Sequence, residues 1–365
     1  MHRSVDDRAF VRPLVRHLQC HIDNIAEGIP GKHARRTAAA WVYMSALAAW
    51  AEDHGITPGR LRADALPARN QYLSQGGTAV GWLVLAVADI AVHPAAWPLL
   101  DPAYGNPVRD ASPSESGARE LLDWWAGDAP TLAYPTSSGP ATITGWLPGD
   151  LLQLVTDERR LAHALCQTPW WLADGILDRT LIPAAREFPN QTLRLIDPTC
   201  GTGHFLIRAI DALWELYTTG ALNPRQMRMD GATGWTPVGP KQAARRILAG
   251  VDGVELDPIT AAVARLRVAV TVAHLLRTAD ALPGPLRLAT LPQGMVPRIV
   301  VGDSLIAGKV SQAEYARMRP EQARIVNLGT DEPTVELPAQ PPTGPTVQPL
   351  PPKEEGQLSL FSDVA

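Results

Sequence analysis

The sequence has few cysteines and no long apolar run among its first residues. Three cysteines in 365 residues are too few for a disulfide framework, so we expect a reducing, cytoplasmic location. The N-terminal residues, Met-His-Arg-Ser-Val-Asp-Asp, contain no apolar core of a secretory signal. The most apolar stretch, residues 78–89, is about half as long as the ~20 residues of a membrane span, which predicts a buried helix and no membrane contact.

Excess positive charge is also lacking, because the formal net charge is −4. Proteins that bind nucleic acid on their own are often basic, so any DNA contact would need a local basic face. No metal site is predicted. The length allows two domains, and the 45% of apolar residues allow each to bury a core, in which we expect most of the tryptophans to lie.

Residue patterns divide the chain into three predicted parts. Residues 1–148 are expected to form a helical domain, with helices at 5–27, 34–52, 76–92 and 116–126. Residues 149–330 alternate strands with helices, which predicts an α/β fold with a parallel sheet. The tail, 331–365, is rich in proline and is expected to be extended and disordered. In the α/β part we expect strands at 193–197, 250–255 and 298–302, and helices at 172–188, 204–218, 240–248 and 258–277.

Residues 193–205, Leu-Arg-Leu-Ile-Asp-Pro-Thr-Cys-Gly-Thr-Gly-His-Phe, carry the most informative pattern in the chain. An apolar strand ends in an acidic residue, and a glycine-rich turn then opens a helix, as in sites for nucleoside-containing ligands. The dinucleotide fingerprint is not completed, because Leu206 stands where its third glycine would be. The run resembles the first motif of DNA adenine-N6 methyltransferases, which bind S-adenosylmethionine (SAM). On this resemblance the cofactor-binding candidates are Asp197, Pro198, Cys200, Gly201, Gly203 and Phe205.

Acidic residues also end the next two predicted strands. A carboxylate at the tip of the second strand can accept hydrogen bonds from both ribose hydroxyls, and the resemblance assigns this role to Glu255 and an adenine contact to Leu256. Asp303, after the third strand, would accept a hydrogen bond from the exocyclic amine of the cofactor. The Asp257-Pro258 pair indicates a helix N-cap followed by proline at the first helical position.

Thr168 precedes Pro169 at the distance where the family has a segment around the methionine end of the cofactor. It is a candidate cofactor contact, and a plain helix N-cap is an equally good interpretation. Residues 149–152, 167–169 and 176–181 and the first motif resemble the methyltransferase of BREX (phage growth limitation) defence systems. Residues 100–107 and 118–125 resemble its N-terminal helical region, so the likeness covers roughly residues 1–310.

The resemblance implies a partial Rossmann-like class I SAM-methyltransferase sheet. It also implies SAM-dependent adenine-N6 methylation of double-stranded DNA in a restriction-modification or phage-defence system, with other defence subunits as partners. Such enzymes use an [Asn/Asp]-Pro-Pro-[Tyr/Phe] motif to hold the flipped-out adenine. That motif is absent: Asn327 lacks the Pro-Pro-aromatic sequence, and the 101–104 Asp-Pro-Ala-Tyr run falls within the N-terminal region. No catalytic residue is therefore assigned.

The missing motif leaves three interpretations open. One is a methyltransferase that is incomplete as a single chain, and another is a non-catalytic SAM-binding subunit or truncated relic that acts as a partner or adaptor. The third is the same fold acting on RNA or protein. In the family the first strand is central, so here it would present an unpaired apolar edge. We expect this edge to be covered by the N-terminal helices, by residues 323–328 or by a second methyltransferase half.

Residues 356–361 near the C-terminus resemble the short peptide with which bacterial proteins dock in the apolar pocket of the replication sliding clamp. Such peptides bind because a few apolar anchors on a flexible tether fill preformed pockets. A tail without this function is the alternative. The candidate clamp contacts are Gln357, Leu358, Leu360 and Phe361.

Overall fold

The computed structural model describes residues 6–133, 145–156, 168–222, 234–304 and 310–318. The chain divides into two compact units, Met1–Leu165 with Pro285–Leu291, and Cys166–Gly284 with Pro292–Ala365. The sequence placed a domain boundary after residue 148, whereas helix α6 (Leu147–Val155) spans that position and falls in the first unit. The predicted disordered tail, residues 331–365, lies outside the described residues.

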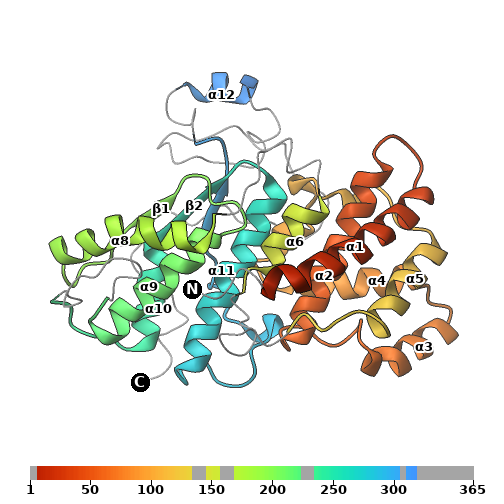
Figure 1. Ribbon diagram of the computed structural model, residues 1–365, viewed down its shortest axis with the longest axis horizontal. Helices are drawn as coiled ribbons and strands as arrows, with labels where there is room; N and C mark the ends of the chain where they lie inside the picture. Colours follow the sequence, from red (N-terminus) through yellow and green to blue (C-terminus); the bar gives the residue numbers. More distant parts are fainter. Residues whose placement is uncertain (1–5, 134–144, 157–167, 223–233, 305–309, 319–365) are drawn as a thin grey trace. The chain divides into compact units, whose positions relative to one another are not determined.

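Helices build the described part of the first unit (Figure 1). They begin and end close to the predicted limits in most cases, but α3 and α6 fall in segments where no helix was expected. The nine residues of α3 bury no side chain, so the sequence has no apolar stripe there to reveal it. The helices are α1 (Asp6–Glu27), α2 (Ala34–Asp53), α3 (Leu66–Ser74), α4 (Ala79–Ala88), α5 (Glu115–Ala126) and α6.

The apolar run at 78–89 forms a helix that buries one face, as expected. The Thr78 hydroxyl accepts a 2.9 Å hydrogen bond from the Gly81 N–H and so caps α4 at its start. Trp82 and Leu83 of this helix are buried in the first unit. Trp50 and Trp125 are also buried, and the Trp125 indole donates to the Ser45 hydroxyl over 2.9 Å. The expectation that tryptophans lie in the core is confirmed at these positions.

The second unit holds a three-stranded parallel sheet in the order β1-β2-β3, which confirms the predicted strands and their direction. Ile196 of β1 lies opposite Asp252 of β2, and Val254 of β2 lies opposite Val300 of β3. Each strand is shorter than predicted by one to two residues. The strands are β1 (Leu195–Asp197), β2 (Val251–Glu255) and β3 (Arg298–Val301), and the helices are α8 (Trp170–Glu187), α9 (His204–Thr219), α10 (Pro240–Gly250), α11 (Pro258–Thr278) and α12 (Gln312–Met318).

Helices α9 and α11 pack against the strands, and α8 and α10 pack in turn on α9. Two of these helices begin directly after strands, so their first turns lie at the carboxyl edge of the sheet. The Asp257 side chain accepts a 2.9 Å hydrogen bond from the Thr260 N–H and Pro258 takes the first helical position, which confirms the predicted cap of α11. Helix α8 instead has Pro169 at its N-cap, so the capping interpretation of Thr168 is wrong.

Helix α11 is long and apolar enough to cross a membrane by length and composition alone, with a mean hydropathy of 1.6. However, 89% of this apolar window is buried inside the protein, as in the core helix of a globular fold. Its packing against β2, β3 and α9 accounts for that burial.

Candidate cofactor-binding site

The turn after β1 is fastened to the end of β2. The Cys200 N–H donates to the backbone oxygen of Val254 over 2.9 Å, and the Gly203 N–H closes the turn on the Cys200 oxygen at 2.8 Å. Gly201 and Gly203 have φ angles of 54° and 85°, a left-handed conformation that is costly for any residue with a Cβ atom. The glycines of the motif are therefore required by the backbone itself.

Strand β2, beneath the turn, contains a glycine that was not among the predicted site residues. A Cβ atom at Gly253 would lie 3.0 Å from the Cys200 sulfur and 3.0 Å from Cδ1 of Leu206, closer than side chains normally pack. Gly253 thus allows the loop and α9 to sit directly on β2. A glycine inside a strand often marks a place where another segment approaches the backbone closely, so Gly253 could have predicted this packing from the sequence.

The Glu255 carboxylate joins the end of β2 to the loop that follows β1. Its Oε2 accepts a 2.9 Å hydrogen bond from the Gly201 N–H, and its Oε1 accepts one of 2.9 Å from the Asp257 N–H. The residue is only 8% exposed, and this burial raises the pKa of Glu255 to about 7, against the opposing effect of the backbone donors. The backbone of Leu256 is a third hydrogen-bond donor to this carboxylate. Since a carboxylate offers about four acceptor sites, capacity for a further donor remains.

Asp303 follows β3 at the same edge and is buried. The Gly302 N–H donates to the Glu255 backbone oxygen over 2.8 Å, which places the Asp303 turn beside the end of β2. The Asp303 N–H donates to the Tyr315 hydroxyl at 2.8 Å, so a residue of α12 supports this turn. Tyr315 was not singled out from the sequence, since a lone tyrosine in a short helix carries no motif.

The other predicted site residues have different surroundings. Asp197 accepts a 3.1 Å hydrogen bond from the Thr199 N–H, and burial raises the pKa of its carboxyl. Burial also raises the pKa of the Cys200 thiol. Leu256 and Thr168 are half-buried, Pro198 is exposed, and Phe205 lines a groove beside β1. The clamp-peptide candidates, residues 357–361, lie outside the described residues.

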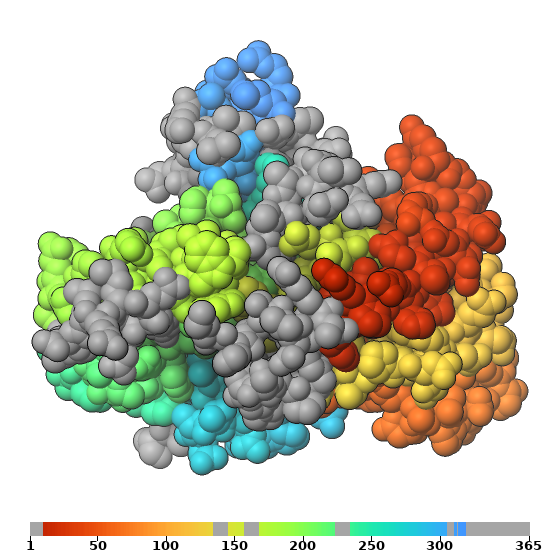
Figure 2. Space-filling model, in the orientation of Figure 1, coloured from red at the N-terminus to blue at the C-terminus, as the bar shows by residue number. Residues whose placement is uncertain are grey.

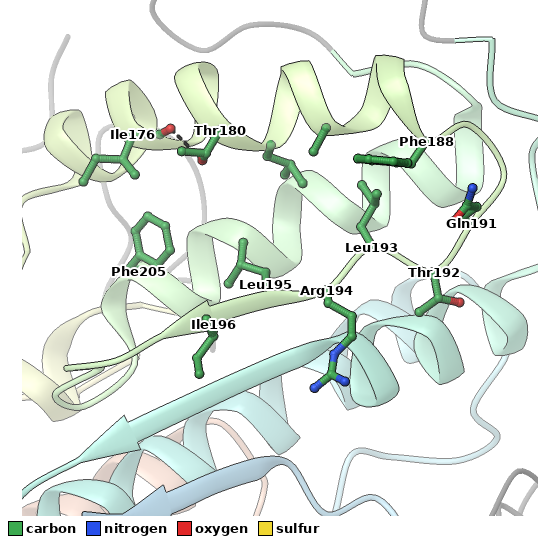
Figure 3. Close-up of a pocket in the computed structure, with 12 residues that line it drawn as sticks. Ile176, Thr180, Phe188, Gln191, Thr192, Leu193, Arg194, Leu195, Ile196 and Phe205 are labelled. Atoms are coloured by element: carbon green, nitrogen blue, oxygen red, sulfur yellow. Dashed lines mark hydrogen bonds between the residues drawn. The ribbon is translucent and has the colours of Figure 1, made fainter. Parts of the chain in front are cut away.

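A groove of about 580 Å³, lined by apolar and polar side chains, runs between α8 and β1. In Figure 3, Ile176 and Thr180 of α8 lie across the groove from Leu195 of β1 and Phe205 of α9. Within the described residues β1 pairs with β2 alone. Residues 323–328, one of the expected covers of this edge, lie outside the described residues. Ile196 on this strand is 61% exposed.

Helix α8 and the residue after it carry several exposed apolar side chains, two of which line the groove. Trp171, Leu172 and Ile176 of this helix, and Phe188 just after it, are all exposed. Figure 2 shows α8 (yellow-green) at the surface of the second unit.

The residues described by the structure include no cluster of three or more histidine, cysteine, aspartate or glutamate side chains that could hold a metal ion. The site therefore consists of a glycine-rich turn and buried carboxylates at the ends of three parallel strands. Arrangements of this kind define α/β proteins that bind nucleoside-containing ligands.

Comparison with known proteins agrees with the motifs. No protein-family model matches the chain. The adenine-specific methyltransferase PglX of Streptomyces coelicolor is 31% identical over 264 residues, which are 67% of this chain and 21% of that protein. The resemblance predicted from the motifs is confirmed, and the chain spans about a fifth of the length of this curated relative.

A solved structure of the Type IIL restriction-modification enzyme MmeI in complex with DNA is also similar. It shares 15% sequence identity, and the match covers 83% of this chain and 41% of that chain, with a TM-score of 0.38. A likeness of this degree carries no conclusion about function.

Proposed function

We propose that this chain is the SAM-binding part of a DNA adenine-N6 methyltransferase of a restriction-modification or phage-defence system. The observation that carries the proposal is the hydrogen bond from Gly201 to the buried Glu255 carboxylate, beside the Asp303 turn. The three β1–β3 strands would form the first half of a Rossmann-like methyltransferase sheet. The 31% identity to an adenine-specific methyltransferase supports the same family-level assignment.

The residues at the carboxyl edge fit the chemistry of SAM. The adenosine part offers two kinds of donor, the paired ribose hydroxyls and the exocyclic amine, and Glu255 and Asp303 would be buried acceptors for them. The left-handed glycines, Gly201 and Gly203, allow close approach of the loop backbone. The Asp197 carboxylate at the start of the turn suits the positive charge of the methionine end. When bound, SAM would supply a methyl group on a positively charged sulfur.

We infer that the half of the enzyme that binds the target adenine of DNA lies beyond the described residues. Two observations support this. The sequence contains no [Asn/Asp]-Pro-Pro-[Tyr/Phe] motif, and the outer edge of β1 is unpaired in the described part. The missing motif equally favours the alternative, in which a non-catalytic SAM-binding subunit or truncated relic acts as a partner or adaptor.

Tritiated SAM, incubated with the purified chain and unmethylated genomic DNA, tests for the cofactor site and for an acceptor site on this chain. Label recovered as N6-methyladenine would show that the chain carries its own acceptor site, which would overturn the inferred half-enzyme. Label bound to protein without transfer is the result we expect. Absence of bound label at high micromolar SAM would overturn the proposed cofactor site. Parallel samples with RNA or with protein as acceptor test those substrates.

The proposal includes double-stranded DNA as partner and a cytoplasmic location. It also keeps the sliding-clamp contact predicted from residues 357–361, which rests on sequence alone. A fluorescently labelled peptide of residues 353–365 tests that contact directly. Its failure to bind the cognate clamp at high micromolar concentration would exclude it.

A further inference from the structure

Arg267 of α11 is a buried cation that contacts the glycine-rich loop between β1 and α9, residues 198–203. It is only 2% exposed, and its Nη1 donates to the Thr202 backbone oxygen at 2.5 Å and to the Thr202 hydroxyl at 3.0 Å. Thr202 is itself fully buried and lies between the two left-handed glycines. Burying a guanidinium costs free energy unless its donors are satisfied, and here two of the acceptors belong to one loop residue.

A second contact joins α11 to the same loop one helical turn earlier. A Cβ atom at Gly203 would lie 3.5 Å from the Cβ of Ala264, so the helix packs directly against the glycine. Ala264 and Arg267 are three residues apart and lie on one face of the helix. Consecutive loop residues, Thr202 and Gly203, are thus supported by consecutive turns of α11.

The loop needs such support because glycine has more conformational freedom to lose than any other residue. Gly201 and Gly203 flank Thr202, and the Gly201 N–H must stay on the Glu255 carboxylate to keep that acceptor oriented. A loop with two glycines in three residues cannot hold this arrangement by its own torsional preferences. A fixed point at Thr202 restricts both glycines at once.

We propose that Arg267 is a positioning residue for the cofactor site, holding the Thr202 peptide so that the glycine turn and Glu255 keep their binding geometry. This inference rests on the proposed function, because the ligand that the loop is held for is SAM. Arg267 acts through the loop and touches no ligand itself.

Arg265 provides a matched control on the same helix. It is 8% exposed, and its Nη1 donates to the Ile299 backbone oxygen of β3 at 3.2 Å. Arg265→Met therefore removes a buried arginine and a backbone contact of similar kind, but away from the loop. Arg267→Met removes the loop contact. Arg267→Lys keeps the positive charge but has fewer donors than arginine and lacks the fixed planar arrangement of the guanidinium.

The test measures SAM affinity and amide hydrogen exchange of all variants, at a temperature below the lowest unfolding midpoint. We expect R267M to weaken SAM binding about tenfold, equivalent to about 1.4 kcal/mol, and to speed exchange in peptides covering residues 199–204. R267K should lie between R267M and the wild type. R265M should lower the unfolding midpoint but keep the wild-type affinity and loop exchange.

Wild-type affinity and loop exchange in R267M would overturn the positioning role, as would an equal effect of R265M. If R267M does not fold, R267K decides, since loss of both affinity and loop protection supports the role and wild-type values for both overturn it. If the wild-type chain itself fails to bind SAM, the proposed function fails. The exchange comparison between R267M and R265M then still decides whether Arg267 holds the loop.

Discussion

The Gly201 N–H donates to the Glu255 carboxylate across 2.9 Å, so one buried acidic group joins the loop after β1 to the end of β2. Burial raises the pKa of Glu255 to about 7, so the carboxyl changes charge within the pH range in which most proteins are studied. The ionised form accepts hydrogen bonds at both oxygens, whereas the protonated form must donate at one of them. The charge state of Glu255 should therefore control both ligand binding and stability.

The first prediction concerns the pH dependence of SAM binding. If only the ionised Glu255 binds ribose hydroxyls well, lowering the pH from about 8 to about 6 should weaken affinity roughly tenfold, as the carboxyl is protonated below its raised pKa. Equilibrium dialysis across this range measures the effect. The titration of SAM itself is common to all samples, so the control is Glu255→Gln, which should bind weakly with a flatter profile. Equal pH profiles for the two proteins would contradict the role of Glu255.

The second prediction concerns stability without ligand. The pKa of Glu255 is raised from 4.5 in the unfolded reference to about 7 in the folded chain, so the folded chain binds more protons at this site between those values. The contribution of Glu255 to the free energy of unfolding is then fully present below about pH 4.5 and is lost as the pH rises through about 7.

Urea unfolding between about pH 5.5 and about pH 7.5 measures that contribution. The wild type should lose about 2 kcal/mol from this carboxyl over the range, relative to E255Q. E255Q is expected to be less stable at every pH, because its amide nitrogen faces a backbone donor. The difference in slope is the readout, and parallel curves would show that the pKa of Glu255 is not raised by folding.

The third prediction separates backbone strain from cofactor binding. Gly203→Ala should cost about 1–2 kcal/mol of stability, because alanine disfavours the φ of 85° at this position. Gly31, with a φ of 97° and open space around its Cα, allows the same change in the first unit. G31A should lose similar stability and bind SAM normally, whereas G203A should also lose about tenfold or more in SAM affinity. If titration calorimetry gives similar SAM affinities for G203A and G31A, the loop is not part of the binding site.

The sequence predicted much of this site because its signals are local. The glycines of the β1 turn, the acidic strand ends and the Asp257-Pro258 cap each lie within a few residues of the element that they define. The supporting contacts were missed because they join segments far apart in the chain. Arg267 reaches Thr202 across 65 positions, and no spacing rule on a single helix indicates that its guanidinium points at a loop.

Phe205 lines the groove that α8 forms with β1, a placement that the sequence did not predict. Its assignment as a cofactor contact stays a prediction. Tertiary packing decides which side of β1 the first turn of α9 faces. The spacing of residues around the turn therefore cannot predict where the Phe205 side chain lies. Helix α3 was missed for a related reason, because it buries no side chain and so has no apolar period.

The fourth prediction tests the support that α12 gives to the Asp303 turn. Tyr315→Phe removes the hydroxyl that accepts the Asp303 N–H, leaving a buried donor without that acceptor at a cost of about 1–3 kcal/mol. We expect SAM affinity to fall several-fold, because Asp303 is the proposed acceptor of the adenine amine.

Tyr217→Phe is the matched control for this change. The Tyr217 hydroxyl accepts the Leu193 N–H at 3.0 Å, the same kind of bond, but before β1. Y217F should lower the unfolding midpoint and leave SAM affinity unchanged. If Y315F also leaves affinity unchanged while it lowers the midpoint, the Asp303 turn does not depend on α12 for binding.

The fifth prediction concerns the open edge of β1. Ile196 is 61% exposed on a strand whose outer edge is unpaired in the described residues, and exposed apolar edges promote association between chains. Ile196→Lys should therefore reduce concentration-dependent self-association in light scattering, with little loss of stability since the side chain is mostly solvated. Val84, an exposed apolar residue on α4, allows the same change away from the sheet. If V84K suppresses association as strongly as I196K, added charge rather than the β1 edge is responsible, and if neither does, this edge is not where chains associate.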